Sequence, residues 1–256
     1  MSLLIDSKLE LEQLASGAYN SNAHEIGRRA FLIGAGAYVL SACGKGGASS
    51  TTGPSTGSSG DLSGRITDLQ AARDIITHNQ TSIGGSSFRS LDCITRWDLP
   101  IAIYVDSSIN KDNVDEAMRY WQSAAGLNYF ITGTNQEPRI LIRQGTDGVG
   151  TGPGGYRGRG LIDGTYSNNR ARSGLVVLGP EAADCNLSDR NCVYIFRHEI
   201  GHALAFLGHD DSGGLMASNG AGNINLSQRE INMMRELSKL PHGARVEPNG
   251  TWRVVK

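Results

Sequence analysis

The order of the predicted elements indicates one α+β domain in residues 90–256, preceded by an N-terminal segment that does not belong to it. Strand-like and helix-like apolar patterns follow one another in the second half of the chain and end with two helices, as in α+β folds. A stretch rich in glycine, serine and threonine, at 44–60, separates that half from the beginning of the chain, because such a composition cannot build a core. With 256 residues, the chain has room for one good-sized domain and an appendage.

The elements of this domain follow from the spacing of apolar residues. The expected strands are 98–106, 140–142 and 174–178, where branched and aromatic residues cluster or alternate. The expected helices are 112–125, about 188–207, and a last one that begins at Ser227 with a Ser227–Glu230 capping box and ends near Pro241. Residues 64–78 show a weaker helical pattern, so we assign 64–92 as an N-terminal helical segment or a pro-segment.

Residues 145–169 lie between two expected strands and are rich in glycine. We predict no regular structure for them, because a long glycine-rich loop in a compact domain is typically functional or mobile. Such a loop could hold a calcium ion, with Asp147 or Asp163 as a ligand, which makes Ca²⁺ a second metal candidate.

The beginning of the chain has the character of an export signal. Residues 30–42 form an uncharged apolar run that is shorter than the roughly 20 residues of a membrane-spanning helix but suits the core of a signal peptide. The alternative, a buried helix at the start of a domain, is disfavoured by the glycine- and serine-rich stretch that follows at once. Arg28 and Arg29 before the run resemble the twin-arginine export signal, and residues 40–43 resemble the lipobox of bacterial lipoproteins.

These resemblances imply a signal peptide at 1–42, a lipid on Cys43 and a linker at 43–63. The mature protein would then be exported and anchored by its lipid to the outer membrane or the cell surface, with plain secretion as the alternative. In a Gram-negative bacterium, Gly44 rather than Asp after the cysteine favours the outer membrane.

The segment His198-Glu199-Ile200-Gly201-His202 carries the chemistry. On a helix, the two histidines differ by about 40° around the axis and about 6 Å along it, so both imidazoles reach one ion. Glu199 is offset by about 100° from His198 and can border the metal as a base without binding it. The alternative is a surface helix with two solvated histidines and a glutamate in a salt bridge.

His209 and Asp210 are the candidates for a third ligand. If the helix continued unbroken, His209 would lie about 10 Å beyond His202 along the axis, too far to share an ion. The helix must therefore end soon after His202 and the chain must turn back. We expect Gly208 to help this return, because glycine tolerates left-handed backbone angles.

The whole stretch, HEIGHALAFLGHD, resembles the signature H-E-x-x-H-x-x-G-x-x-H of the metzincin metallopeptidases, specifically the matrixins. Two departures exist: Ala205 stands where the family has glycine, and His209 arrives one residue late. Alanine in a left-handed conformation costs about 1 kcal/mol or more. Residues 213–216 resemble the methionine turn beneath the metal, and the segments 96–106, 117–127 and 224–241 also look like matrixin segments.

The resemblance implies a matrixin-like catalytic domain at 93–256, a metzincin-like zincin with a twisted, mostly parallel sheet, an active-site helix and a C-terminal helix. His198, His202 and His209 would bind Zn²⁺ above Met216, and Glu199 would act as general base in peptide-bond hydrolysis, with a protein or peptide substrate. An edge strand around 161–178 could pair with an extended peptide. We expect a monomer.

The expected export of the protein also bears on whether the remaining cysteines form disulfides. Cys185 and Cys192 are the most plausible disulfide in an oxidising compartment. Cys93 is then a buried thiol or, as in the pro-segment of matrixins, a residue that holds the enzyme latent. His78 and His242 have no ligand-like neighbours, and we expect them at the surface.

The balance of 24 basic against 25 acidic side chains gives no basic field that would favour nucleic acid. The first hypothesis is a zinc endopeptidase. One alternative is a catalytically degenerate lipoprotein of the same fold that acts as a binding module, which Ala205 and the late histidine would favour and Glu199 disfavours. Another is a metal enzyme that hydrolyses a different bond.

Overall fold

The computed structural model describes residues 62–80, 93–147, 149–151, 155–210, 212–218 and 223–255. The signal peptide, Cys43 and nearly all of the linker lie outside these residues. Within the described part, no helix has the length and apolar character needed to cross a bilayer.

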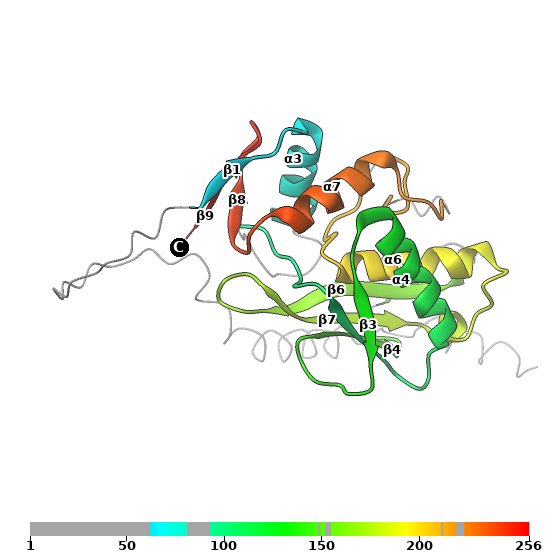
Figure 1. The fold of residues 1–256 in the computed structure, drawn as a ribbon. Helices are drawn as coiled ribbons and strands as arrows, with labels where there is room; N and C mark the ends of the chain where they lie inside the picture. Colours follow the sequence, from blue (N-terminus) through cyan, green and yellow to red (C-terminus); the bar gives the residue numbers. More distant parts are fainter. Residues whose placement is uncertain are drawn as a thin grey trace, which may run out of the picture. The chain divides into compact units, whose positions relative to one another are not determined.

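Six strands form the main sheet in the order β3-β2-β4-β7-β6-β5 (Figure 1). The first four are parallel to one another, β6 is antiparallel to β7, and β5 is antiparallel to β6. The strands are β2 (Ile101–Val105), β3 (Tyr129–Thr132), β4 (Arg139–Gln144), β5 (Gly150–Thr151), β6 (Arg157–Thr165) and β7 (Ala171–Leu178). The mostly parallel sheet with several helices is a mixed α/β architecture compatible with the predicted α+β class.

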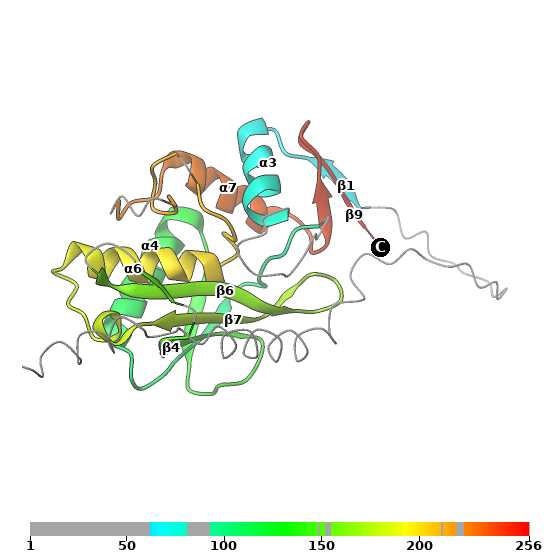
Figure 2. The same ribbon diagram turned by 180° about the vertical axis from the view of Figure 1, so that it is seen from behind.

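Helix α6 (Arg190–Ala203) lies along β6 and β7, and α4 (Lys111–Ala125) packs beside it (Figures 1 and 2). Both were predicted, but α6 ends four residues before the expected position 207. The short helix α5 (Pro180–Ala183) connects β7 to this layer. Trp121 of α4 is fully buried and donates its indole N–H to the Arg197 carbonyl of α6 at 2.9 Å, so the two helices are joined by packing and by a hydrogen bond.

A second group of elements brings the two ends of the described chain together. Helix α7 (Gln228–Lys239) begins with the predicted Ser227–Glu230 capping box. It packs against α3 (Leu69–Ile75), which continues as the π-helix Ile76–Gln80. Beside α3 lies a small sheet in the order β1-β9-β8 (Figure 1). Its strands are β1 (Ser63–Arg65), β8 (Ala244–Val246) and β9 (Thr251–Val254), none of which was predicted.

The prediction of no regular structure for 145–169 was wrong. Strand β6 occupies nine of these residues, and its glycines allow close approach to α6. A Cβ atom on Gly160 would lie 1.7 Å from the Glu199 carbonyl oxygen, and one on Gly158 would lie 2.6 Å from the Glu199 side chain. Glycine is therefore required here by packing against a helix, which a sequence pattern cannot distinguish from glycine in a loop.

The expected edge strand at 161–178 also needs correction, because β7 pairs on both sides and lies inside the sheet. The outer strand is β6. The described part of β5 pairs with it at Arg157 and Gly158, and no outer strand pairs with Arg159–Gly164 among the described residues.

The contact between β6 and α6 generates a stability prediction. Gly160→Ala should lower the free energy of unfolding by about 1–3 kcal/mol or more, because the added methyl group overlaps a backbone carbonyl. Urea unfolding followed by circular dichroism measures this change. Gly133→Ala is the matched control, since a Cβ atom there meets nothing within 4 Å. Equal unfolding midpoints for the two variants would contradict the packing.

Candidate metal centre

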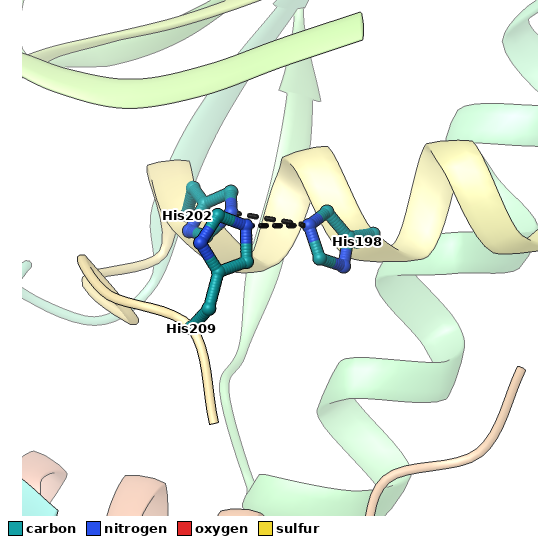
Figure 3. A group of neighbouring side chains, drawn as sticks. All are labelled: His198, His202 and His209. Atoms are coloured by element: carbon teal, nitrogen blue, oxygen red, sulfur yellow. Dashed lines mark hydrogen bonds between the residues drawn. The ribbon is translucent and has the colours of Figure 1, made fainter. Parts of the chain in front are cut away.

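Three histidine side chains converge from α6 and the loop that follows it (Figure 3). His198 Nε2 lies 3.2 Å from His202 Nε2 and 3.3 Å from His209 Nε2. Among the described residues, these three form the one group of three or more His, Cys, Asp or Glu side chains whose ligand atoms are close enough to share a metal ion. His198 and His202 are buried, whereas His209 is exposed, so the group opens to solvent on the side of the loop.

The outer nitrogens of the two helical histidines are fixed by backbone carbonyls. His198 Nδ1 lies 2.8 Å from the Leu215 oxygen, and His202 Nδ1 lies 2.6 Å from the Phe206 oxygen. A carbonyl oxygen can only accept, so both Nδ1 atoms carry the proton and donate. Burial lowers the pKa of His198 to about 4 and that of His202 well below its usual value, and both rings are therefore neutral near neutral pH.

A neutral ring that is protonated on Nδ1 has a bare lone pair on Nε2. The Nε2 atoms of His198 and His202 therefore cannot hydrogen-bond to each other, although they lie 3.2 Å apart. Ligand nitrogens at about 2.0–2.1 Å from a zinc ion, in tetrahedral directions, are about 3.3–3.4 Å apart. The donor set thus fits a metal ion, and the hydrogen bonds to carbonyls are those that typically orient histidine ligands.

The chain reverses directly after α6, as the third ligand requires. Ala205 has a φ of 93°, in the left-handed region, and the Phe206 N–H donates to the Gly201 carbonyl at 3.1 Å to close the end of the helix. The expectation for Gly208 was wrong, because the left-handed residue is Ala205, at a cost of about 1 kcal/mol or more. Asp210 does not join the histidines: its backbone N–H donates to Met216, and its carboxylate lies 3.6 Å from Arg229.

Glu199 lies beside His198 on α6 and is buried against β6, with 8% of its surface exposed. Burial raises the pKa of this carboxyl to about 8, while a hydrogen bond from the Gly160 N–H and the charge of Arg159 act in the opposite direction. A carboxyl whose pKa is close to 7 can both take up and release a proton near neutral pH, as general acid–base catalysis requires.

The turn at residues 213–216 lies beneath α6. Met216 is fully buried, and a Cβ atom on Gly201 would lie 2.7 Å from its sulfur, so glycine between the two histidines lets the turn approach the helix. The buried carboxylate of Glu230 accepts hydrogen bonds from the N–H groups of Leu215 and Met216, at 3.2 and 2.7 Å. Glu230 thereby holds the turn whose Leu215 carbonyl orients His198.

Several residues of the site could not be found from the sequence. The carbonyls of Leu215 and Phe206 act through the backbone, which no residue type reveals. The Tyr194 hydroxyl, one turn before His198, lies 3.2 Å from His198 Nδ1, and burial raises its pKa to about 12. Glu230 was identified only as a helix cap. Its second role depends on the tertiary position of the turn.

The remaining predicted site residues lie outside the histidine group. Cys185 and Cys192 form the predicted disulfide, just before and within α6. Cys93 is buried and is not part of the histidine group.

Asp147 pairs with Arg143 at 3.8 Å, and neither Asp147 nor Asp163 belongs to a group of potential metal ligands within the described residues. His242 pairs with Asp98 at 2.6 Å near the surface, but His78 is buried, contrary to expectation.

The raised pKa of Glu199 predicts how the stability of the metal-free protein depends on pH. The pKa is about 8 in the folded state against an ordinary value of 4.5, so between these values the folded state binds more protons than the unfolded state. The free energy of unfolding should therefore fall as pH rises, by up to about 1.4 kcal/mol per pH unit. The lowered pKa values of His198, His202 and His242 act in the opposite direction, and this effect fades within about one pH unit above 6.5, the ordinary pKa of histidine.

Urea unfolding in a chelating buffer between about pH 7.5 and 8.5, above the range in which unfolded histidines are protonated, reports mainly on Glu199. We expect the midpoint of the parent protein to fall over this interval and that of Glu199→Gln to fall less. Part of the slope should persist in the variant, because burial also raises the pKa of Glu230. A parent midpoint that stays constant or rises would contradict the assignment.

The role of Glu230 predicts a second effect on stability. Glu230→Gln should lower the free energy of unfolding by about 1–3 kcal/mol, since the amide leaves backbone donors of the turn without a charged acceptor. Glu236→Gln is the control on the same helix, because Glu236 pairs with the exposed Lys239 and the change should alter stability by less than about 1 kcal/mol. Thermal or urea unfolding measures both, and equal losses would refute the role.

Comparison with known proteins gives no identification. No known protein family matches this chain, and no curated protein is significantly similar to it in sequence.

Proposed function

We propose that this protein is a zinc-dependent endopeptidase in which His198, His202 and His209 hold the metal and Glu199 is the general base. One observation carries the proposal: the Nε2 atoms of His202 and His209 lie 3.2 and 3.3 Å from that of His198, and the buried Glu199 lies next to His198 on α6. A site that only stored or bound a metal would have no use for a buried carboxylate with a raised pKa.

The choice of zinc rests on the donor set. Neutral imidazoles suit Zn²⁺, and three protein ligands with one open position are typical of catalytic rather than structural zinc. When bound, zinc supplies a Lewis acid that polarises a carbonyl oxygen and brings the pKa of a water molecule down to about 7. The exposure of His209 is consistent with access of a substrate to the open side.

Glu199 is suited to moving the proton. As the carboxylate, it would take a proton from the attacking water, and as the acid it would give that proton to the leaving amine. Its pKa of about 8 applies to the metal-free protein; a bound cation would lower it and favour the carboxylate that starts the reaction.

The outer strand β6 supports a peptide as substrate. No outer strand pairs with Arg159–Gly164 among the described residues, and the same strand contacts Glu199 through Gly158 and Gly160. An extended peptide that added to this edge would run past the histidine group, and main-chain pairing of this kind binds peptides with little dependence on sequence. The resemblance of residues 198–216 to matrixins supports the same proposal.

Export and lipid anchoring belong to the same proposal and rest on residues 28–43 and on the disulfide. The Cys185–Cys192 bond is of the kind that persists outside the cytoplasm. The binding-module alternative rested on Ala205 and on the late position of His209. These two departures do not prevent the three nitrogens from converging, so they give that alternative little weight.

The proposal predicts one zinc per chain and hydrolysis of an unfolded protein such as casein by the full chain. His202→Ala should lose the zinc and the activity, because two ligands remain. Glu199→Gln should keep the zinc and lose activity by about 10²–10⁴-fold, the usual contribution of a general base. Metal analysis and release of acid-soluble peptides measure the two effects.

The control is His242→Ala, which removes a histidine that pairs with Asp98 and is not part of the group. It should leave both zinc content and activity unchanged. Absence of zinc in the parent would refute the proposal, and zinc without hydrolysis of any of several protein substrates would favour the binding module.

A further inference from the structure

The loop between α6 and His209 contacts the π-helix Ile76–Gln80 from the N-terminal side of the domain. The His78 carbonyl accepts hydrogen bonds from the N–H groups of Leu207, at 2.7 Å, and Gly208, at 3.3 Å. The His78 ring stacks on Phe206 with ring centroids 5.2 Å apart. Three consecutive residues before His209 therefore rest on one residue of this segment.

Asn79 holds the strained residue of the loop. Its side-chain N–H₂ group donates to the Ala205 carbonyl at 2.8 Å and to the Thr95 carbonyl at 2.7 Å, and its oxygen accepts from the Thr95 N–H at 2.9 Å. Both donors and the acceptor of this buried amide are thus used. Ala205 has a φ of 93°, which alanine avoids, so an external contact is needed to keep its carbonyl in this direction.

The same loop determines the positions of two ligands. His209 follows it directly, and the Phe206 carbonyl accepts the hydrogen bond that orients His202. At the far side, the buried Asp74 of α3 binds Arg229 at 2.6 and 2.8 Å, and Arg229 lies 3.6 Å from Asp210, the residue after His209. The segment Asp74–Gln80 therefore contacts the loop directly through His78 and Asn79, and it reaches Asp210 only through Arg229.

We propose that the segment Asp74–Gln80 is a permanent part of the metal centre and that Asn79 is the positioning residue for the loop that carries His209. The proposal rests on the metal-binding part of the proposed function. It also distinguishes between the two predictions for residues 64–92, which were a helical segment of the domain and a removable pro-segment. A removable pro-segment would leave an enzyme that works without these residues, whereas here their removal would release the third ligand.

A matched pair of variants separates positioning from general stability. Asn79→Ala removes the contact with the ligand loop. Gln80→Ala removes a neighbouring buried amide that also makes two backbone hydrogen bonds, but to Val246 of β8, at 3.0 and 2.7 Å. Both variants are made in the full chain, and their urea midpoints show how much stability each has lost.

The first readout is zinc affinity, measured by competition with a chromophoric chelator. We expect Asn79→Ala to weaken zinc binding by about 10- to 100-fold, the range found when a residue that orients metal ligands is removed. Gln80→Ala should stay within about twofold of the parent. In the Asn79→Ala, Ala205→Gly double variant, affinity should recover in part, since glycine adopts positive φ without strain. Equal weakening by both single variants, or no recovery, would overturn the proposal.

The second readout needs no metal. In the zinc-free protein, Asn79→Ala should speed hydrogen exchange of the Leu207 and Gly208 amides, which donate to His78, while exchange in α4 stays unchanged. Gln80→Ala should not speed exchange at these amides selectively. If the parent binds no zinc, the proposed function fails, and this comparison still decides whether Asn79 positions the loop: faster exchange everywhere, or nowhere, would refute it.

Discussion

A straight helix would carry His209 away from His198 and His202, because each residue advances the helix axis by about 1.5 Å. The whole candidate site depends on the reversal of the chain that prevents this. Helix α6 stops at Ala203, and Ala205 takes a left-handed conformation that returns the loop toward the two helical histidines. Because alanine is strained there, the surrounding structure has to hold the turn. The contacts of the loop with Asn79 and His78 therefore contribute to the site, although neither residue belongs to the histidine group.

Backbone carbonyls orient the ligand nitrogens of the two helical histidines. Carbonyl oxygens of Leu215 and Phe206 fix the protons of His198 and His202 on Nδ1, and both Nε2 lone pairs then face the same point. Both carbonyls lie in segments that another element holds. Glu230 of α7 accepts a hydrogen bond from Leu215, and His78 of the π-helix accepts hydrogen bonds from the two residues after Phe206. The site is thus assembled from α6, the turn before α7, and the N-terminal π-helix, which lies far from the other two in the sequence.

Close packing also determines the position of Glu199, the proposed general base. Strand β6 can approach α6 only because Gly158 and Gly160 have no side chains, and the approach buries Glu199 and raises the pKa of its carboxyl to about 8. On the opposite side, Gly201 lets Met216 and Trp121 reach the helix. The helix that carries the motif is therefore packed tightly on two sides, which fixes its rotation and the direction of its histidines.

The sequence alone determined the parts of this protein that depend on local spacing. The i, i+4 histidines, the need for a chain reversal and the capping box at Ser227 follow from short-range geometry, and the Cys185–Cys192 bond was predicted from the expected export and the short distance between the two cysteines in the sequence. Only the tertiary structure decided what depends on distant contacts: the glycines of β6 belong to a strand, Gly208 does not take a left-handed conformation in the reversal, and His78 is buried. The physical reason is that a glycine, a strained alanine or a buried carbonyl is selected by a neighbour far along the chain, and that neighbour leaves no periodic pattern in the sequence.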